Sequence, residues 1–490
     1  MKLRWTLAAL LASVACSSES GLASPTLISI EPAWTLESAP ADVIIVGEGF
    51  VPAPERRFGL GVFLDSEFQA RLGGVALEGV RRVDPTRIAA HVPPTLPFGT
   101  HDLEVIAPTG AAQLAGAFSV IPGASCPAGQ CASVGPWPYA PSNFDPLALS
   151  PSANAAVDGC AAEFSTTTDS FVTDTCGLRP NISRVISAGQ EATALAFGDL
   201  ILGAGASLRL TGDRPAILAV FGNARIDGSV LANSTRWLRG AGSSAYPVNV
   251  GPCVGRAGGD AGDASSGGGG AGARDSGAAG GDHPLSSGAG GAGGGADPSH
   301  SSIPLRGGCP GGAPASTVLM GGGPGRGGGA LQISARGELL VTGVVSASGS
   351  GGPGGSANHE AGYGGGSGGM VVLEGDRLIL SDTAKLTANG GAGGGGTATG
   401  SSSGTWGGDG ETASAQPAPG GAAAGGNAAS GGAGGSGTSP PLPGGISAGD
   451  DGSGGGGASS GAIFVRSSPA LCTVSPAAVV SPPAAFANCP

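Results

Sequence analysis

The sequence predicts an all-β protein with a small β-sandwich followed by a long stack of parallel strands that carries glycine-rich loops. Three observations favour this class. Short alternating strands, separated by proline and glycine, fill residues 25–122. A unit of alternating apolar residues repeats from about residue 186. Glycine dominates the composition, and 72 of the 98 glycines fall within 251–460 without the strict three-residue repeat of collagen.

The N-terminus has the pattern of an export signal. Lys2 and Arg4 precede an apolar run at 7–14 that is too short to span a bilayer. Cys16 follows small residues, and this arrangement resembles the lipobox of bacterial lipoproteins, although Ser13 stands where leucine is usual. The chain is therefore expected to leave the cytoplasm.

The lipobox resemblance implies that residues 1–16 are a lipoprotein-type signal peptide and that Cys16 carries lipid. By the same family analogy, the serine after this cysteine implies sorting to the outer membrane or cell surface. The alternative is an ordinary signal peptide, cut near Ala15 or Ala23, and a secreted protein. Residues 17–24, which are rich in serine, are expected to form a flexible tether.

The cysteine count is consistent with an oxidising compartment. The chain has nine cysteines, and setting Cys16 aside leaves an even eight. Their proximity suggests, without fixing the connectivity, four disulfides: Cys126 with Cys131, Cys160 with Cys176, Cys253 with Cys309, and Cys472 with Cys489. Zinc binding is the alternative, but only the first pair approaches the spacing of zinc ligands, and it lacks a second pair. We therefore expect no bound metal and no cofactor.

Residues 25–122 carry the pattern of a known domain family. In order, they contain PTLISIEP, VIIVGEGF, VPP, GTHDLEV and GAFSV. This order resembles the TIG domain, also called IPT, which has an immunoglobulin-like β-sandwich fold. The residues that carry the resemblance are Ile28, Ile30, Pro32, Gly47, Gly49, Phe50, Val92, Pro93, Pro94, Gly99, Val105, Phe118 and Val120. Residues 54–72 are longer than the family usually has. The resemblance implies a spacer or binding module without catalytic residues.

Residues 123–185 are irregular and rich in proline, serine and cysteine, and we expect them to form a connector. Trp137 and Tyr139 in this connector are candidate ligand contacts, as is Trp34 in the N-terminal domain. Tryptophan and tyrosine are large and usually substantially buried, so the favoured alternative is that Trp137 and Tyr139 cover an edge of the next domain.

The apolar repeat aligns unit by unit over 186–470. The matched residues are Ile226 with Val341, Val230 with Val345, Leu331 with Val371, Ile333 with Leu373, Leu339 with Leu378, Val341 with Leu380, and Val345 with Leu386. A fourth copy starts at 461–467. Because no unit can bury its apolar side alone, the units are expected to stack as a parallel β-helix-like region. Residues 471–490 are expected to follow it as a tail capped by a disulfide.

The glycine-rich tracts recur between the repeat units and end just before each hydrophobic restart. Insertions that recur at one point of a repeat lie on one side of the stack. Glycine has no side chain to bury and is entropically costly to order, so we expect long solvated loops that contribute little stability. Two alternatives stay open: the tracts are disordered, or they form the ordered core as packed polyproline-type glycine helices in place of the β-helix.

The candidate catalytic groups are scattered along the chain. β-Helices host polysaccharide lyases and hydrolases, which need carboxylates, or a carboxylate and a basic residue, on one surface. The candidates are Asp213, Asp227, Glu374, Asp376 and Asp382, with Arg377 and Lys385. They fall mostly at turns, and no two recur at one strand position, so we assign no catalytic residue. The five histidines show no metal-ligand spacing.

Charge and composition limit the partners. The net charge is −12 and there is no basic run, so we expect no nucleic-acid partner. We expect a structural or adhesive surface lipoprotein and no enzyme. Its N-terminal lipid would hold it at a membrane, and its partner would be a surface polysaccharide or another surface protein. The alternative is a carbohydrate-binding protein or a polysaccharide-degrading enzyme that uses the β-helix-like region.

Overall fold

The computed structural model of the chain is divided into two compact units, Met1–Pro136 and Trp137–Pro490. It describes residues 24–31, 34–36, 41–57, 61–97, 99–121, 137–244, 246, 253–285, 288–297, 301–315, 323–356, 358–468 and 471–489. The expected all-β class is confirmed, because these ranges contain strands, one short 3-10 helix, η1 (Pro146–Ala148), and no α-helix. Over the same ranges, no helix has the length and apolar character needed to span a membrane.

The first unit has a four-stranded and a five-stranded sheet. The four-stranded sheet has the order β1 (Thr26–Glu31), β3 (Ala41–Glu48), β9 (Arg87–Val92) and β8 (Glu78–Asp84). The five-stranded sheet has the order β2 (Trp34–Leu36), β11 (Gly110–Ile121), β10 (Gly99–Ala107), β6 (Gln69–Leu72) and β7 (Val75–Ala76). The long segment at 54–72 contributes most of a separate hairpin of β4 (Ala53–Arg57) and β5 (Gly61–Asp65).

The two sheets of the first unit share one hydrophobic core. Successive side chains of a strand point to opposite faces, so each strand turns alternate residues inward. Ile45 of β3 and Ile88 of β9 come from one sheet, and Leu103 of β10 and Phe118 of β11 come from the other. These four side chains have no solvent exposure, and neither has the ring of Phe50, which belongs to the same core.

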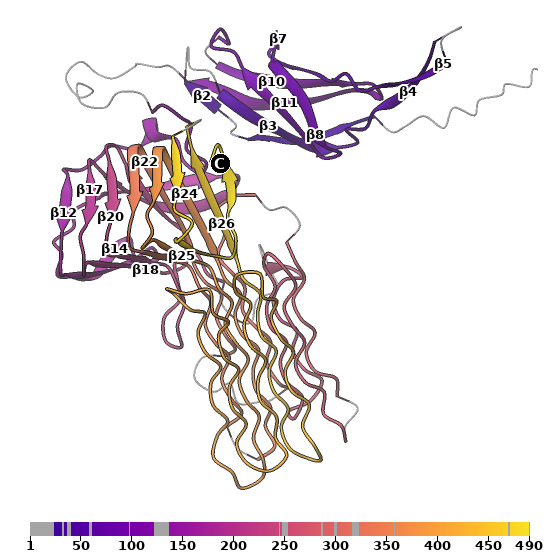
Figure 1. Cartoon of the computed structure of the whole chain (residues 1–490), viewed down its shortest axis with the longest axis vertical. Helices are drawn as coiled ribbons and strands as arrows, with labels where there is room; N and C mark the ends of the chain where they lie inside the picture. The colour runs from indigo at the N-terminus through magenta and orange to yellow at the C-terminus, as the bar shows by residue number, and fades with distance from the viewer. Residues whose placement is uncertain are drawn as a thin grey trace, which may run out of the picture. The chain divides into compact units, whose positions relative to one another are not determined.

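The second unit has two further sheets whose strands form three parallel columns (Figure 1). The first column contains β16 (Gln190–Phe197), β19 (Ala216–Val220), the first parts of β22 (Ala330–Val341) and β24 (Met370–Leu380), and β26 (Ala462–Ser467). The second contains β12 (Ala155–Val157), β17 (Leu200–Leu202), β20 (Ala224–Ile226), the last parts of β22 and β24, and β27 (Cys472–Val474). The third contains β13 (Ala161–Ser165), β18 (Ser207–Thr211), β21 (Ser229–Leu231), β23 (Val344–Ser346), β25 (Lys385–Thr387) and β28 (Val479–Ser481).

Three more strands complete these columns. They are β14 (Ser170–Asp174), antiparallel to β13; β15 (Asn181–Ser187), antiparallel to β16; and β29 (Ala485–Ala487), parallel to β26. We call β12 to β29 together the strand stack.

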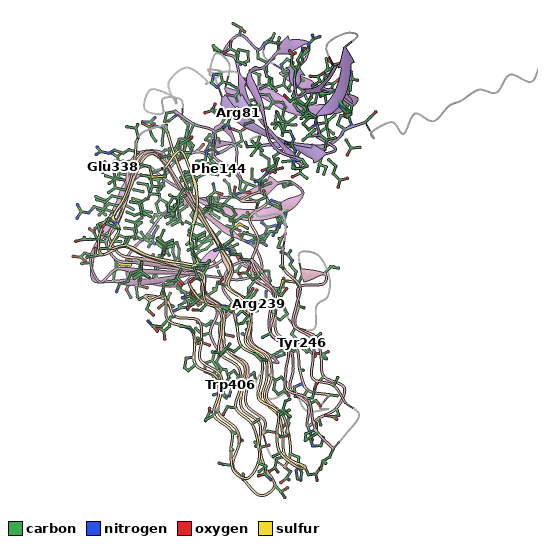
Figure 2. All side chains as sticks on the ribbon, turned by 45° about the vertical axis from the view of Figure 1, so that its right-hand side comes forward. Arg81, Phe144, Arg239, Tyr246, Glu338 and Trp406 are labelled. Atoms are coloured by element: carbon green, nitrogen blue, oxygen red, sulfur yellow. A yellow bond between two sulfur atoms is a disulfide. The ribbon has the colours of Figure 1, made fainter. Side chains whose placement is uncertain are left out.

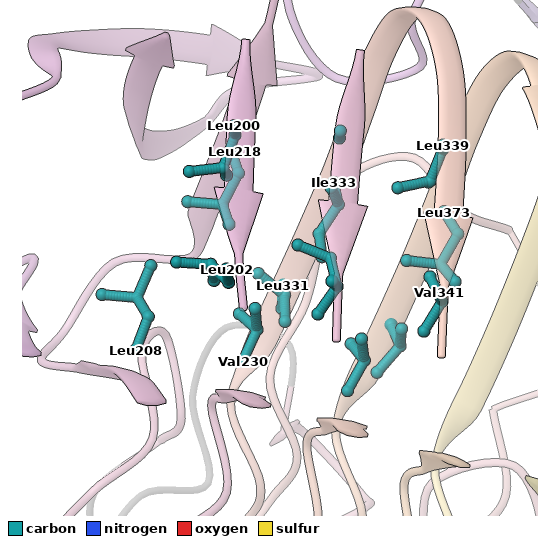
Figure 3. Close-up of a cluster of buried hydrophobic side chains, with 14 of the residues drawn as sticks. Leu200, Leu202, Leu208, Leu218, Val230, Leu331, Ile333, Leu339, Val341 and Leu373 are labelled. Carbon is teal, nitrogen blue, oxygen red and sulfur yellow. The ribbon is translucent and has the colours of Figure 1, made fainter. Parts of the chain in front are cut away.

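The register of the strand stack is the one that the apolar repeat predicted. Ile226 pairs with Val341, and Ile333 pairs with Leu373. The remaining matched pairs also occur, namely Val230 with Val345, Leu331 with Val371, Leu339 with Leu378, Val341 with Leu380, and Val345 with Leu386. These side chains are buried in one cluster between the columns (Figure 3). The repeat therefore reports which residues lie beside each other in the core.

The strand stack begins earlier and ends later than the sequence suggested. We expected a connector at 123–185, but its described part contains β12, β13 and β14 and the start of β15, which belong to the two sheets. The segment 471–490, which we expected to be a tail, contributes β27, β28 and β29. Most of these strands have only three to five residues, so their alternation was too short to detect in the sequence.

The glycine tracts are ordered segments that hydrogen-bond to one another with a period of three residues. Residues 388–396 have neither a strand nor a helix pattern. Every third N–H group in this run donates to the same neighbouring segment. Gly390, Gly393 and Gly396 donate to the carbonyls of Gly435, Gly432 and Ala429, and Gly391, Gly394 and Thr397 donate to those of Gly366, Tyr363 and Glu360. Ala392 and Gly395 donate to the carbonyls of Gly408 and Thr405. A polyproline II helix has about three residues per turn and no internal hydrogen bonds. The three-residue period of the hydrogen bonds in this run is therefore that of a polyproline II helix.

Segment 389–398 lies among six neighbours. Its N–H groups donate to the three segments just named, and its carbonyls accept from 349–355, 421–424 and 452–458. Segments 266–272 and 452–459 repeat the same three-residue pattern. We call the described parts of 253–313, 347–369 and 388–461 the glycine bundle. Its segments run side by side away from the strand stack (Figure 1).

Glycine allows this packing because the segments approach more closely than a side chain would permit. A Cβ atom on Gly394 would lie 1.8 Å from the carbonyl oxygen of Pro353, and one on Gly270 would lie 1.9 Å from that of Gly457. The central runs of the bundle are buried, at 266–272, 361–369, 386–398 and 452–461. The expectation of solvated loops is therefore wrong for these tracts, and the alternative of packed polyproline-type glycine helices describes them.

Three of the four expected disulfides are present. Cys160–Cys176 lies in the first turn of the strand stack, Cys472–Cys489 in its last turn, and Cys253–Cys309 within the glycine bundle. Cys126 and Cys131 lie outside the described residues, as does Cys16. Disulfides persist mainly in oxidising compartments, so these bonds favour an exported protein.

Candidate functional site

Two of the three aromatic candidates for ligand contact are enclosed by the protein. Trp137 is only 5% exposed, and its ring packs edge-on against Tyr139 and Phe221. The Tyr139 hydroxyl donates to the carbonyl of Ala335 at 2.7 Å, and burial raises the pKa of Tyr139 well above its ordinary value. Both side chains cover the strand stack. Trp34 lies in β2, and its side chain is outside the described residues.

Glu374, the fully buried member of the catalytic candidates, is held by its neighbours. Its carboxylate accepts from the Ser142 N–H at 3.1 Å, from the Gln332 amide at 3.0 Å and from the Ser334 hydroxyl at 2.9 Å. The Ser142 hydroxyl also donates to it, and Arg466 Nη1 lies 3.7 Å away. A buried charge is costly unless it is paired and hydrogen-bonded, and this carboxylate is both.

The polar network around Glu374 fixes the covering segment 137–149. Asn143 in this segment is 1% exposed, and both ends of its side-chain amide are bonded. Its partners are the Gln332 side chain, the Ser302 carbonyl, the Ser187 hydroxyl and the Leu305 N–H. Fully satisfied buried networks make a structure rigid. We therefore interpret Glu374 as a group that holds 137–149 on the outer face of β22 and β24.

The other catalytic candidates are spread along the strand stack. Asp213 is hydrogen-bonded to Thr167 and Arg239, and Asp227 to Arg225 and Thr342. Asp376 is hydrogen-bonded to Ser468, and Arg377 lies 3.6 Å from Glu338. Asp382 lies in a turn, and Lys385 is the first residue of β25. Burial would raise the pKa of Asp227, but hydrogen bonds from Thr342 and Arg225 lower it overall. No group of three or more His, Cys, Asp or Glu residues suited to a metal occurs in the described part of the chain.

A pocket that sequence reasoning missed lies where the glycine bundle meets the outer face of the strand stack. Its cavity volume is about 40 Å³, and it is open to solvent on one side. Its charged lining is Arg256, Arg274, Asp297 and Arg306. The lining is completed by Ala273, Ser301, Met370 of β24, Ala462 and Phe464 of β26, and four glycines. Three arginines within 256–306, in a chain with only 23 basic residues, are a weak sequence signal that did not show that they converge.

An exposed stack of aromatic and basic side chains is the second feature that the sequence did not reveal. The guanidinium carbon of Arg236 lies 4.5 Å from the ring centroid of Trp237 and 3.9 Å from that of Trp406. Trp237 is 67% exposed. Trp406 lies partway along the glycine bundle (Figure 2). Cation–π contacts thus join two rings that are distant in the sequence, and one ring is left facing solvent.

Comparisons with known proteins assign no family to this chain. No protein-family model matches the sequence, and no curated protein matches it significantly. The resemblance of residues 25–122 to the TIG domain therefore rests on its own residues alone.

Proposed function

We propose that the chain is an exported structural or adhesive protein of the bacterial surface, in which the glycine bundle is a rigid binding platform. The observation that carries this proposal is the bundle itself. It is a body of extended segments that are bonded to one another through their backbones. The candidate contact residue is Trp237, which precedes the bundle in the chain and is joined through Arg236 to Trp406 of the bundle.

Rigidity is what such a platform requires. Fixing a residue costs about 1–2 kcal/mol of backbone entropy, and glycine loses the most. In the bundle this cost falls on folding, because the segments are already hydrogen-bonded before any partner arrives. A preorganised surface binds without a further ordering cost, so even a small contact area gives useful affinity.

The exposed ring of Trp237 supports contact with a saccharide. A tryptophan ring offers a large flat apolar face, and a sugar ring has a complementary face of C–H groups. The neighbouring Arg236 adds hydrogen-bond donors for hydroxyl groups. Tryptophan and arginine are also the side chains most enriched among the dominant contacts of binding surfaces.

The proposal also assigns a fold to each part of the chain. Residues 25–122 would be a TIG-like immunoglobulin-like sandwich that acts as a spacer, and the strand stack would be a β-helix. Lipid on Cys16 would anchor the protein. Membrane fractionation tests the anchor, because wild type should sediment with membranes and Cys16→Ala should be soluble. A wild type that is already soluble would remove the anchor from the proposal.

A glycan array and a cell-surface binding assay with the mature protein test the adhesive role. Trp237→Ala should weaken binding about tenfold or more if this ring is a dominant contact. Leu442→Ala is the control, because Leu442 is an exposed apolar side chain of the bundle, at 53%, that is not part of the Arg236, Trp237 and Trp406 stack, and its loss should leave binding unchanged. Absence of binding to any glycan or cell surface would contradict the adhesive role.

A further inference from the structure

The pocket between the glycine bundle and the strand stack concentrates positive charge in an otherwise acidic protein. Arg256 and Arg306 place their Nη1 atoms 2.5 Å and 3.3 Å from the same oxygen of Asp297. Arg274 donates to the carbonyl of Pro483 at 3.2 Å. Three arginines against one aspartate give the lining a formal charge of 3 − 1 = +2, in a chain whose net charge is −12.

This charge is partly shielded from water. The side chains of Arg256 and Arg306 are 16% and 23% exposed. Burial lowers the pKa of Arg256, and the nearby charge of Arg306 lowers it further. Asp297 raises this pKa, but the net change is a decrease. A half-buried cation without a full counter-charge raises the free energy of the folded state. An anion that enters the pocket would relieve this cost.

Apart from Ser301, the rest of the lining is apolar or is glycine. Met370, Ala462 and Phe464 face outward from β24 and β26, because the residues that alternate with them are buried in the core. Gly307, Gly368, Gly369 and Gly461 also line the pocket, and a Cβ atom on any of them would lie within 2.3 Å of a backbone oxygen of a neighbouring segment. The cavity itself is small, about 40 Å³, so it has room for a carboxylate group while the rest of a ligand would lie over its open side.

We propose that this pocket binds the carboxylate of an acidic sugar unit. The planar fork of a guanidinium group pairs with the two oxygens of a carboxylate. Arg274 and Arg306 supply donors to the anion, and Asp297 positions Arg306 and Arg256. Phe464 and Met370 contact the apolar face of the sugar ring. This binding depends neither on Trp237 nor on the adhesive role.

Isothermal titration calorimetry of the mature protein at low ionic strength tests the site. The probes are a short galacturonate oligomer, its neutral galactose counterpart and inorganic phosphate. Wild type should bind the galacturonate oligomer and not the neutral one, and salt should weaken binding. Arg274→Ala should reduce the affinity about tenfold or more, because a charged hydrogen bond is lost. Arg377→Ala is the control, since Arg377 pairs with Glu338 outside the pocket.

The titrations test separately whether the pocket binds an anion and whether that anion is an acidic sugar. Galacturonate binding that Arg274→Ala weakens and Arg377→Ala does not would support it. Binding of phosphate alone would support an oxyanion site and overturn the sugar. No binding by wild type, or equal binding by wild type and Arg274→Ala, would overturn the site itself. Circular dichroism of each variant would show that the strand stack is intact.

Discussion

At the residue scale, glycine is required wherever the Cβ atom of any other residue would collide with a neighbouring segment. Gly394 and Gly445 both lie in the glycine bundle, and both donate a backbone hydrogen bond. A Cβ atom would lie 1.8 Å from a carbonyl oxygen at Gly394, but no nearer than 3.1 Å to any atom at Gly445. Composition marks both residues as part of glycine-rich tracts, so their different roles could not be predicted without the packing.

Gly394→Ala should therefore destabilise the second unit, and Gly445→Ala should not. A methyl group at Gly394 must push apart two backbone segments, and such overpacking costs about 1–3 kcal/mol. The change at Gly445 should cost less than about 1 kcal/mol, because its neighbours can shift slightly. Chemical unfolding of the two variants measures the difference. Equal stability of both variants would mean that the bundle is loosely packed.

Asp169 gives a pH-dependent prediction. It lies in the β13–β14 turn and accepts from Arg214 at 2.6 Å, Arg184 at 2.9 Å and Thr193 at 3.0 Å. Burial would raise its pKa, but these hydrogen bonds lower the pKa overall. The folded state therefore holds this proton less tightly than the unfolded state. The stabilisation is present above the unfolded pKa of about 4 and is lost as pH falls through the lower folded pKa.

Asp169→Asn isolates this charge, because Asp169 has a φ of 52° and asparagine tolerates that conformation. We expect the variant to be about 1–3 kcal/mol less stable than wild type at pH 7. The gap should close as pH falls from about 4 through the lower folded pKa, because the unfolded wild-type chain binds the proton first and the folded carboxyl binds it last. Urea unfolding at several pH values measures it, and a gap that is constant with pH would contradict the assigned hydrogen bonds.

At the element scale, the strands were predictable where their pattern was long. β22 and β24 have 12 and 11 residues, and their alternation fixed both the existence and the register of the core strands. The first strands were missed because β12, with three residues, is too short to show a period. The order in the glycine tracts could not be predicted, because glycine has no side chain whose pattern would identify a buried face. The pocket arginines belong to those tracts.

The strand stack and the glycine bundle are bonded largely within themselves, so one can be disrupted without the other. Leu373→Asp places a charge at a site with no solvent exposure and should unfold the stack, at a cost above about 4 kcal/mol. Deleting 392–455 should leave the stack folded, because its parallel strands remain and surface insertions are tolerated. The same deletion should disorder 360–366, whose carbonyls accept from 391–397.

Limited proteolysis with fragment mapping checks both variants. New cleavage within 360–366 together with intact strands is expected for the deletion, and general degradation is expected for Leu373→Asp. Loss of the whole second unit in the deletion would show that the bundle holds the strand stack together.

At the scale of the whole molecule, the strand patterns predicted the all-β class, and the disulfides favour an exported protein, but the order within the glycine tracts was not predicted. Few aromatics and many glycines suggested a protein with a small core and long loops. The structure instead combines an apolar core in the strand stack with a backbone-bonded bundle in the tracts. The glycine bundle is the central claim, since the proposed platform and the arginine pocket both depend on it.

Amide hydrogen exchange of the full-length protein, read by mass spectrometry, tests this claim most directly. Peptides that cover 389–398 should exchange about as slowly as peptides of β24, because every N–H from Gly390 to Ala398 has a backbone partner and the run 389–398 is buried. Peptides that cover the more exposed 411–417 should exchange faster and serve as the internal control. Exchange of 389–398 at the rate of an unstructured peptide, beside a protected β24, would contradict the glycine bundle.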